Sequence, residues 1–272
     1  MNKFSWVNMN IVKLVGFLVV VAGALFVCLY GMNFNAKEEE QRKIEYAEAT
    51  LKSETAKIQQ LNVQVSGFYK DETEEFLISQ IEEDQIKQLE SKINQLKIEA
   101  SDFGLEAAQF SVDISEVSKE KEELVFKITD IKEKYMIQNQ LTKMLLQAPQ
   151  TWEVSSETAV INKEASADKL LKIQNDVLKK GGSWGSAMTA YITEMDAQVK
   201  LYTEIKQGIN KMLAGDSLTS EATVENLIYR VEQLPQVKNE QLRKELSDQL
   251  DVIEELLNTQ ALGEEATAEE PV

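Results

Sequence analysis

The most regular hydrophobic pattern in the chain runs from residue 86 to residue 145. With Ile86 taken as position a of a heptad, apolar or aromatic side chains fill fifteen of the eighteen a and d positions as far as Leu145. A seven-residue period sustained over this length is typical of a coiled-coil helix. The residues that define this coiled-coil seam are Ile86, Leu89, Ile93, Leu96, Phe103, Phe110, Ile114, Leu124, Ile128 and Ile131.

The same frame extends backward from Phe68 to Ile44, and no proline occurs before Pro149. Helix-favouring residues dominate this part of the chain, so the pattern predicts a coiled-coil helical stalk over residues 36–147. Between the two periodic stretches, polar residues occupy the seam. Gly67 can end one helix and the D-x-x-E signal at Asp71 can begin another, which predicts a break near residues 67–72.

Two architectures satisfy this pattern. In the first, the break is a kink and the helices form one long rod. In the second, a further turn at residues 101–104 folds the chain into an up-down bundle. Because the heptad frame continues through Ala100 and Phe103 without a shift, the pattern favours the kinked rod.

A second helical region follows a break around Pro149. Apolar residues recur at three- and four-residue spacing from residue 157 to residue 262, with turns at 181–183 and 215–217. This region is long enough to form its own core as a bundle of three or four helices. The acidic tail over residues 263–272 is expected to be disordered. The fold class predicted from the sequence is therefore all-α.

Residues 14–32 contain no charged side chain and follow a short N-terminal tail, residues 1–13. As a helix, these 19 residues would be roughly 28 Å long, close to the thickness of a bilayer's hydrocarbon core. A buried core helix and a signal peptide cleaved near Ala22–Ala24 are the alternatives. Cleavage there would leave an apolar stretch at the new N-terminus, so an uncleaved transmembrane anchor is favoured. The basic residues on the two flanks nearly balance, and the interpretation favours an extracytoplasmic location for the soluble part.

The charge and the composition exclude several functions. Lys and Arg total 29 against 46 Asp and Glu, and a net charge of −17 disfavours nucleic-acid binding. The chain has no histidine and one cysteine, which excludes a histidine-dependent triad, an internal disulfide and a cysteine–histidine zinc site. No phosphate-binding glycine motif is present. We therefore predict no enzyme activity, no cofactor and no metal site.

These features favour a single-pass membrane-anchored coiled-coil protein that acts as a structural or interaction scaffold, or as a component of a membrane-associated complex. Its expected partners are the lipid bilayer, through the N-terminal helix, and either further copies of itself or another helical protein; no small molecule is predicted. Trp152 and Trp184 at turns, with Tyr191 and Tyr202 on a helix, are candidate contact residues, although core packing also explains the helical stripe. The alternatives are a helical sensor that binds a ligand and signals through a partner, and a membrane-active helical protein.

Overall fold

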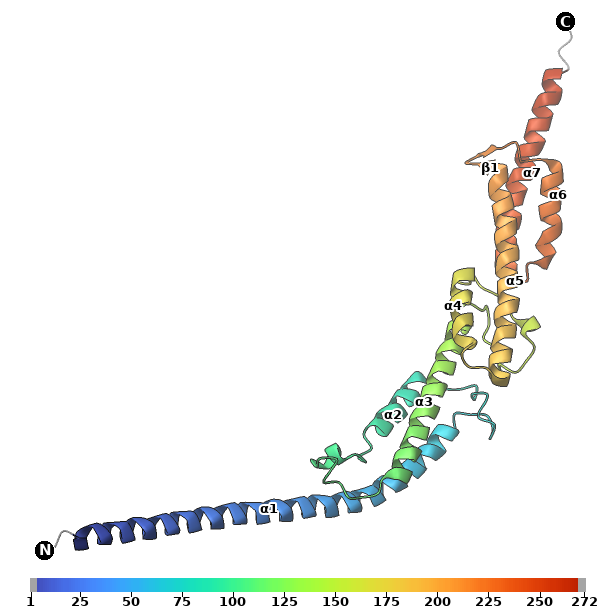
Figure 1. Ribbon diagram of the computed structural model, residues 1–272. Helices are drawn as coiled ribbons and strands as arrows, with labels where there is room; N and C mark the ends of the chain where they lie inside the picture. Colours follow the sequence, from blue (N-terminus) through green and yellow to red (C-terminus); the bar gives the residue numbers. More distant parts are fainter. Residues whose placement is uncertain (1–3, 269–272) are drawn as a thin grey trace. The chain divides into compact units, whose positions relative to one another are not determined.

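The computed structural model describes the backbone of residues 4–268, and side chains at Phe17, residues 20–28, Phe34 and residues 36–262. The described chain is mostly helical, which confirms the predicted all-α class (Figure 1). Its helices are α1 (Phe4–Ser66), α2 (Glu83–Asn94), α3 (Ser115–Thr142), α4 (Ala167–Val177), α5 (Gly182–Met212), α6 (Val224–Gln233) and α7 (Glu240–Ala268). Short 3-10 turns lie at Ala100–Phe103, Ser156–Thr158 and Leu234–Gln236, and the strands β1 (Leu213–Ala214) and β2 (Ser217–Leu218) pair antiparallel.

The chain divides into two compact units. The first unit contains the residues up to Val65 together with Lys87–Lys127, and the second contains Ser66–Ile86 together with the residues from Ile128 onward.

In the first unit, one face of α1 is buried by later segments of the same chain. The buried positions on α1 follow the predicted heptad frame: Ala47, Leu51, Glu54, Ile58, Leu61 and Val65. Ala47 packs in a cluster with Phe103 and Leu105, and the ring of Phe103 lies 6.1 Å from that of Tyr46 and 5.9 Å from that of Phe110. Because residues so far apart in sequence are in contact, the chain must fold back along α1.

The preference for a kinked rod is therefore wrong, because the helix does not continue through residues 95–114. The carboxylate of Asp102 accepts hydrogen bonds from the backbone N–H groups of Ile98 (2.8 Å) and Glu99 (2.9 Å). Gly104 then adopts a left-handed backbone conformation with φ +64°, which residues with a Cβ rarely adopt. A turn at 101–104 was the basis of the alternative, folded-back arrangement.

The predicted seam nevertheless identifies buried positions. Phe110 and Ile114 are half-buried in the segment before α3, and the other predicted seam residues are buried: Ile86, Leu89, Ile93, Leu96, Phe103, Leu124, Ile128 and Ile131. Eight of the ten seam residues are thus buried, and they lie in several shorter segments and not along one long helix.

The predicted membrane span lies within α1, which is continuous from Phe4 to Ser66. Among the described residues, no helix is long enough and apolar enough to cross a membrane. The side chains at positions 14–16, 18–19 and 29–32 of the predicted span lie outside the described set. Those that are described are exposed, including Phe17 at 67%, Phe26 at 70% and Val27 at 70%.

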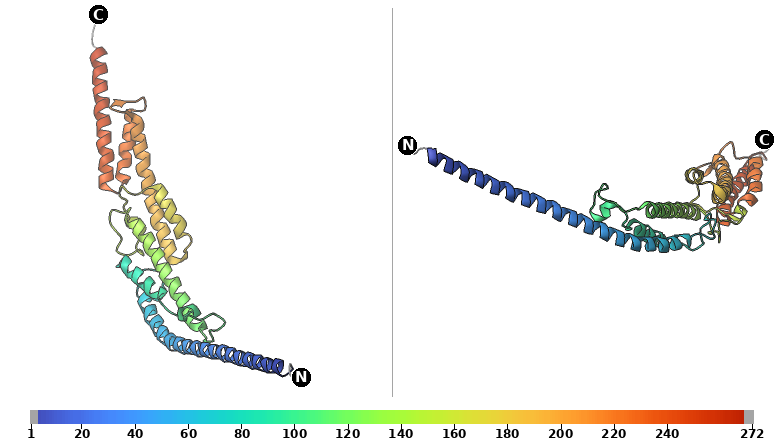
Figure 2. Two further views of the ribbon diagram at one scale, coloured as in Figure 1. Left: turned by 90° about the vertical axis from the view of Figure 1, so that its left-hand side faces the viewer. Right: turned by 60° about the horizontal axis from the view of Figure 1, so that its bottom comes forward.

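In the second unit, α5 is the central helix of the core. Helix α4 packs against it, and α6 and α7 pack against it and against each other (Figures 1 and 2). The stripe predicted on α5 is buried, with Met188, Met195, Ile205 and Ile209 each 0% exposed. Leu242, Leu246, Leu250 and Ile253 of α7 complete this core. The helical bundle expected for residues 157–262 therefore corresponds to α4–α7.

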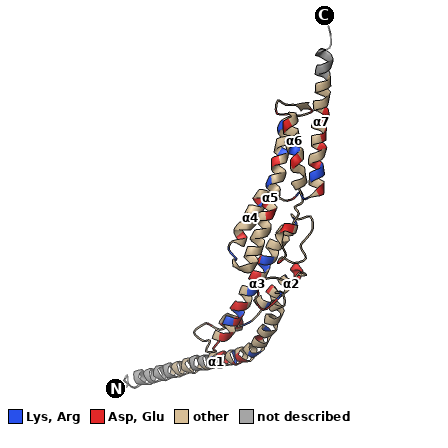
Figure 3. Ribbon diagram, turned by 90° about the vertical axis from the view of Figure 1, so that its right-hand side faces the viewer, with Lys and Arg blue, Asp and Glu red and all other residues tan. Residues whose placement is uncertain are grey.

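The C-terminal helix extends further than the sequence suggested. Helix α7 continues to Ala268, so residues 263–268, which were expected to be disordered, are helical, and residues 269–272 lie outside the described part of the chain. Acidic and basic residues are interspersed along α3, α5 and α7, as expected for solvated helix faces (Figure 3).

Candidate interaction surface

The aromatic residues proposed as contact sites occupy two kinds of position in the second unit. Trp184 and Tyr191 are buried, with exposed fractions of 0% and 1%. Trp152 is half-buried, and its ring packs edge-on against Tyr191 at 5.1 Å. The prediction of contact roles for Trp184 and Tyr191 does not agree with this burial, and the alternative, core packing, describes both residues.

Tyr202 is half-buried and takes part in a small polar group between α5 and α7. Its hydroxyl donates to Glu245 (3.1 Å), and the Lys206 ammonium donates both to that hydroxyl (3.0 Å) and to Glu245 (2.8 Å). The hydrogen bond from Lys206 lowers the pKa of the Glu245 carboxyl, and the bond to Glu245 raises the pKa of Lys206. Tyr202 therefore helps to join two helices of this bundle.

A largely buried ionic cluster lies around Asp130, on the part of α3 that belongs to the second unit. The Asp130 carboxylate accepts from Lys134 (2.8 Å), from Lys180 (2.9 Å) and from the hydroxyl of Tyr69 (3.1 Å). The side chains of Asp130 and Lys134 are 17% and 8% exposed. Glu133 also pairs with Lys180, so two carboxylates face two ammonium groups and the cluster carries no net charge.

The same cluster fastens the loop after α1 to the bundle. The Lys134 ammonium donates to the backbone carbonyls of Glu74 (3.2 Å) and Glu75 (2.8 Å), and it lies 5.8 Å from the centre of the Trp184 ring. The Glu75 carboxylate in turn accepts from the backbone N–H of Trp184 (3.2 Å), in the first turn of α5. A carboxylate is favourable there because the N-terminal N–H groups of a helix are electropositive.

Burial and pairing shift the acid–base properties of this cluster. Burial acts to raise the pKa of Asp130, but the hydrogen bonds from Lys134 and Lys180 outweigh it and hold the pKa below its ordinary value. Burial, assisted by the negative charge of Asp130, raises the pKa of the Tyr69 hydroxyl, which therefore stays protonated and donates. The charged and hydroxyl groups of the cluster thus bond to one another, which is typical of a structural role.

The lowered pKa of Asp130 predicts a pH dependence of stability. A carboxylate whose pKa is lower in the folded state stabilises the fold fully above about pH 5, and this contribution is lost as the pH falls below about 4. We expect the urea midpoint of the second unit to fall more between pH 6 and pH 3 in the wild type than in Asp130→Asn. An equal fall of the urea midpoint in the two proteins would contradict a lowered pKa of Asp130 in the folded state.

Gly182 is required where Glu75 approaches the start of α5. It has φ +67°, and a Cβ at this position would lie 2.7 Å and 2.8 Å from the two carboxylate oxygens of Glu75. Gly182→Ala is expected to destabilise the protein by about 1–3 kcal/mol, through backbone strain and displacement of that carboxylate. Gly215→Ala is the matched control in urea unfolding, because Gly215 has a similar φ of +68° but no atom within 4 Å of its Cβ position. If both variants lost the same stability, the contact with Glu75 would contribute nothing.

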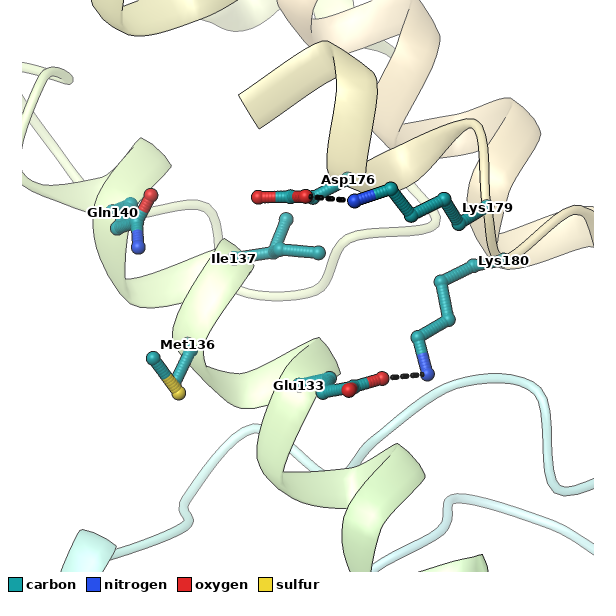
Figure 4. A pocket seen from close by; sticks show the side chains of 7 residues that line it. All are labelled: Glu133, Met136, Ile137, Gln140, Asp176, Lys179 and Lys180. Atoms are coloured by element: carbon teal, nitrogen blue, oxygen red, sulfur yellow. Dashed lines mark hydrogen bonds and ion pairs between the residues drawn. The ribbon is translucent and has the colours of Figure 1, made fainter. Parts of the chain in front are cut away.

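A shallow groove adjoins the ionic cluster. It is lined by Glu133, Met136, Ile137 and Gln140 of α3, by Asp176 of α4 and by Lys179 and Lys180 just after α4, and it encloses about 230 Å³ (Figure 4). Asp176 pairs with Lys179 (2.8 Å) and Glu133 with Lys180, so the charged groups that line the groove compensate each other. No group of three or more potential metal-ligating His, Cys, Asp or Glu side chains occurs in the part of the chain that was described.

Helix α6 exposes several apolar side chains of the bundle. Thr223 caps the start of this helix by accepting from the N–H of Asn226 (3.1 Å). Leu227 is buried at 8%, whereas Val224, Ile228 and Val231 are 61%, 52% and 47% exposed. Spacings of four and three residues place these three side chains on one helix face. We call this set of three residues the α6 face.

The sequence pattern predicted a helical bundle with its own core over residues 157–262, and it did not distinguish the exposed apolar residues of α6 from buried ones. The signal that could have indicated exposure is the shortness of the helix, because ten residues offer few positions for a core-facing stripe and here only Leu227 is buried. The ionic cluster was missed for another reason. Asp130 and Lys134 have the four-residue spacing of an exposed helix pair, and their partners Tyr69 and Lys180 lie 61 and 50 residues from Asp130 in the sequence.

Comparison with known proteins does not assign this chain to a family: no family model, no curated protein and no solved structure matches it.

Proposed function

We propose that this protein is a membrane-anchored helical interaction protein, in which residues 14–32 attach the chain to a bilayer and the helical bundle binds another protein. The observation that carries the proposal is the α6 face, on which three aliphatic side chains are about half exposed on a helix anchored by Leu227. Aliphatic side chains at helical spacing are the pattern by which one helix binds another.

The arrangement of the seam limits how copies of the chain could associate. The seam residues were expected to pair with a second copy or with a partner helix, but most of them are buried by segments of the same chain. Further copies or a partner would then use other surfaces, and the α6 face is an exposed apolar surface of this kind in the second unit. The proposal therefore keeps a scaffold role based on helix–helix contacts, with the α6 face as the contact site in place of the seam.

Membrane attachment is supported by the sequence of residues 14–32 and by the exposure of the described side chains within it. Val20, Leu25 and Phe26 are 70%, 58% and 70% exposed on α1, an arrangement that costs free energy in water and is favourable in lipid. An extracytoplasmic location of the bundle remains part of the proposal.

Membrane attachment predicts resistance to alkaline extraction. The full chain is expected to stay in the membrane pellet after carbonate treatment, and Val20→Lys/Val27→Lys is expected to release it, because each lysine near the centre of a bilayer costs about 3 kcal/mol. A control variant places two lysines at exposed positions outside the predicted span, Glu48→Lys/Glu254→Lys. Release of the wild-type chain by carbonate would contradict the proposed anchor.

Interaction through α6 is tested by photo-crosslinking in the cells that produce the protein. A photoreactive residue in place of Ile228 is expected to form a protein adduct, because this side chain would lie inside the interface. The same residue in place of Glu255, exposed on α7, is the control and is expected to form none. Absence of an adduct at position 228, or equal adducts at both positions, would contradict the interaction function.

A ligand-binding sensor is the second candidate, and the groove at Met136 and Lys180 is the observation that favours it. This groove is small and its charges are already paired, so it offers little binding free energy to a polar ligand. Stabilisation of the wild type but not of Met136→Arg in a thermal screen of metabolites would support the sensor over the scaffold.

A further inference from the structure

We propose that the α6 face binds an amphipathic helix of another protein whose apolar stripe is bordered by lysine or arginine. This inference rests on the proposed interaction function and adds the chemistry of the partner. It is carried by the charges along the borders of the α6 face, which differ on its two sides.

On one side, the α6 face continues into a groove against α7. Val231, Leu234 and Pro235 form its apolar wall, and Glu240, Arg243, Lys244 and Ser247 line the rest. The charged side chains on the α7 side of this groove are paired within α7. Lys244 bonds Asp248 at 2.8 Å, and Arg243 lies 3.9 Å from Glu240. This border therefore presents apolar surface without a strong unpaired charge.

The cation of α6 points away from this surface. The Arg230 guanidinium donates to Glu204 (3.3 Å) and to Gln233 (2.9 Å), and it packs so closely on α5 that a Cβ at Gly208 would lie 2.2 Å from its Nε. Arg230 is thus held against α5 and does not neutralise the opposite border of the α6 face.

That opposite border carries Glu225 and Glu232, both exposed and spaced seven residues apart beside Ile228. Among the residues that the structure describes, neither carboxylate has a hydrogen-bond or ion-pair partner. Glu232 also lies in the last turn of α6, where the helix dipole disfavours a negative charge. Cationic side chains of a partner would pair with both carboxylates and neutralise their charge. Charge complementarity therefore favours a partner helix with lysine or arginine beside its apolar stripe.

The same charges argue against a second copy of this chain on the α6 face. A symmetric pairing places identical surfaces opposite each other, so Glu225 and Glu232 of each copy would approach those of the other. Like charges facing each other across an interface reduce affinity, and the net charge of −17 adds a general repulsion between copies.

The test uses the full chain in a neutral detergent and a fluorescent synthetic peptide that forms an amphipathic helix with leucines at three- and four-residue spacing and lysines on both borders. A peptide with glutamates in place of the lysines is the matched probe. Binding is measured by fluorescence anisotropy for the wild type, for Glu225→Lys/Glu232→Lys and for Ile228→Ser. Glu254→Lys/Glu255→Lys makes the same change of charge on exposed α7 residues and is the control.

The wild type is expected to bind the lysine peptide in preference to the glutamate peptide. Glu225→Lys/Glu232→Lys and Ile228→Ser are each expected to weaken binding of the lysine peptide about tenfold, whereas the α7 control stays within about twofold of the wild type because distant charges are screened. Equal weakening by the two double charge variants would overturn the proposal, as would a preference for the glutamate peptide or self-association of the chain through Ile228.

These outcomes separate the inference from the function on which it rests. If position 228 forms protein adducts in cells but the charge variants bind the peptide alike, the interaction function stands and the basic partner is wrong. If neither adducts nor peptide binding are observed, both proposals fail.

Discussion

Replacement of Asp130 by alanine is expected to destabilise the second unit by about 3 kcal/mol or more, because removing one member of a buried ion pair leaves the other charge uncompensated. Asp130 bonds Lys134, Lys180 and the hydroxyl of Tyr69, and the side chain of Lys134 is 8% exposed. The backbone carbonyls of Glu74 and Glu75 keep Lys134 in place and cannot supply the lost negative charge. Urea unfolding followed by tryptophan fluorescence measures this loss.

The control for this variant is Asp176→Ala, in the same unit. Asp176 bonds Lys179 at 2.8 Å, but the two side chains are 55% and 74% exposed. An exposed pair of this kind contributes at most about 1 kcal/mol, so the control is expected to unfold almost at the wild-type midpoint. If Asp130→Ala lost no more stability than Asp176→Ala, the ionic cluster would not hold the loop to the bundle.

Replacement of Trp184 by alanine is expected to cost about 3–5 kcal/mol, the usual loss when a large buried aromatic side chain is truncated. Trp184 is 0% exposed, lies near the ammonium of Lys134 and belongs to the same core cluster as Met188 and Tyr191. Thermal unfolding followed by far-ultraviolet circular dichroism measures the effect without depending on tryptophan fluorescence.

Two further variants serve as controls for the loss of stability in Trp184→Ala. Trp184→Phe keeps most of the ring volume and removes an indole N–H that has no hydrogen-bond partner in the described structure, so it is expected to lose much less stability. Leu178→Ala, at a side chain 67% exposed, is expected to change stability by less than about 0.5 kcal/mol. A small loss of stability in Trp184→Ala would contradict the core role of Trp184 and favour the contact role that its position at a turn suggested.

The sequence predicted burial better than it predicted helix continuity. In the first unit, Leu89, Ile93 and Phe103 are buried as the heptad frame requires, yet Phe103 lies in a 3-10 turn and not in a coiled-coil helix. Periodicity reports which side chains face a core, and a turn that places Phe103 against Ala47 preserves the period while reversing the chain. Asp102 and Gly104 were the local signals of that turn.

The candidate surface was less accessible to sequence analysis. Trp184 was proposed as a contact because it lies at a turn, and Tyr191 because it lies on an apolar helical stripe, but large aromatic side chains also fill cores. Whether an apolar residue of α6 is buried depends on how α6 sits on α5 and α7, and local spacing does not contain that information. The buried pairing of Asp130 with Lys134 likewise has the same four-residue spacing as an exposed helix pair.

The central structural claim is that the heptad-spaced side chains of the first unit are buried within a single chain, which leaves other surfaces for a partner. Crosslinking between cysteines at positions 46 and 103 tests this claim most directly, in a Cys28→Ser background that removes the natural thiol. In a continuous rod these positions would be roughly 85 Å apart, whereas the rings of Tyr46 and Phe103 lie 6.1 Å apart in the structure. A short bis-maleimide is expected to join the two cysteines within one chain, with no mixed products between isotopically labelled and unlabelled chains. Crosslinks found only between different chains would contradict the account and restore an intermolecular coiled coil.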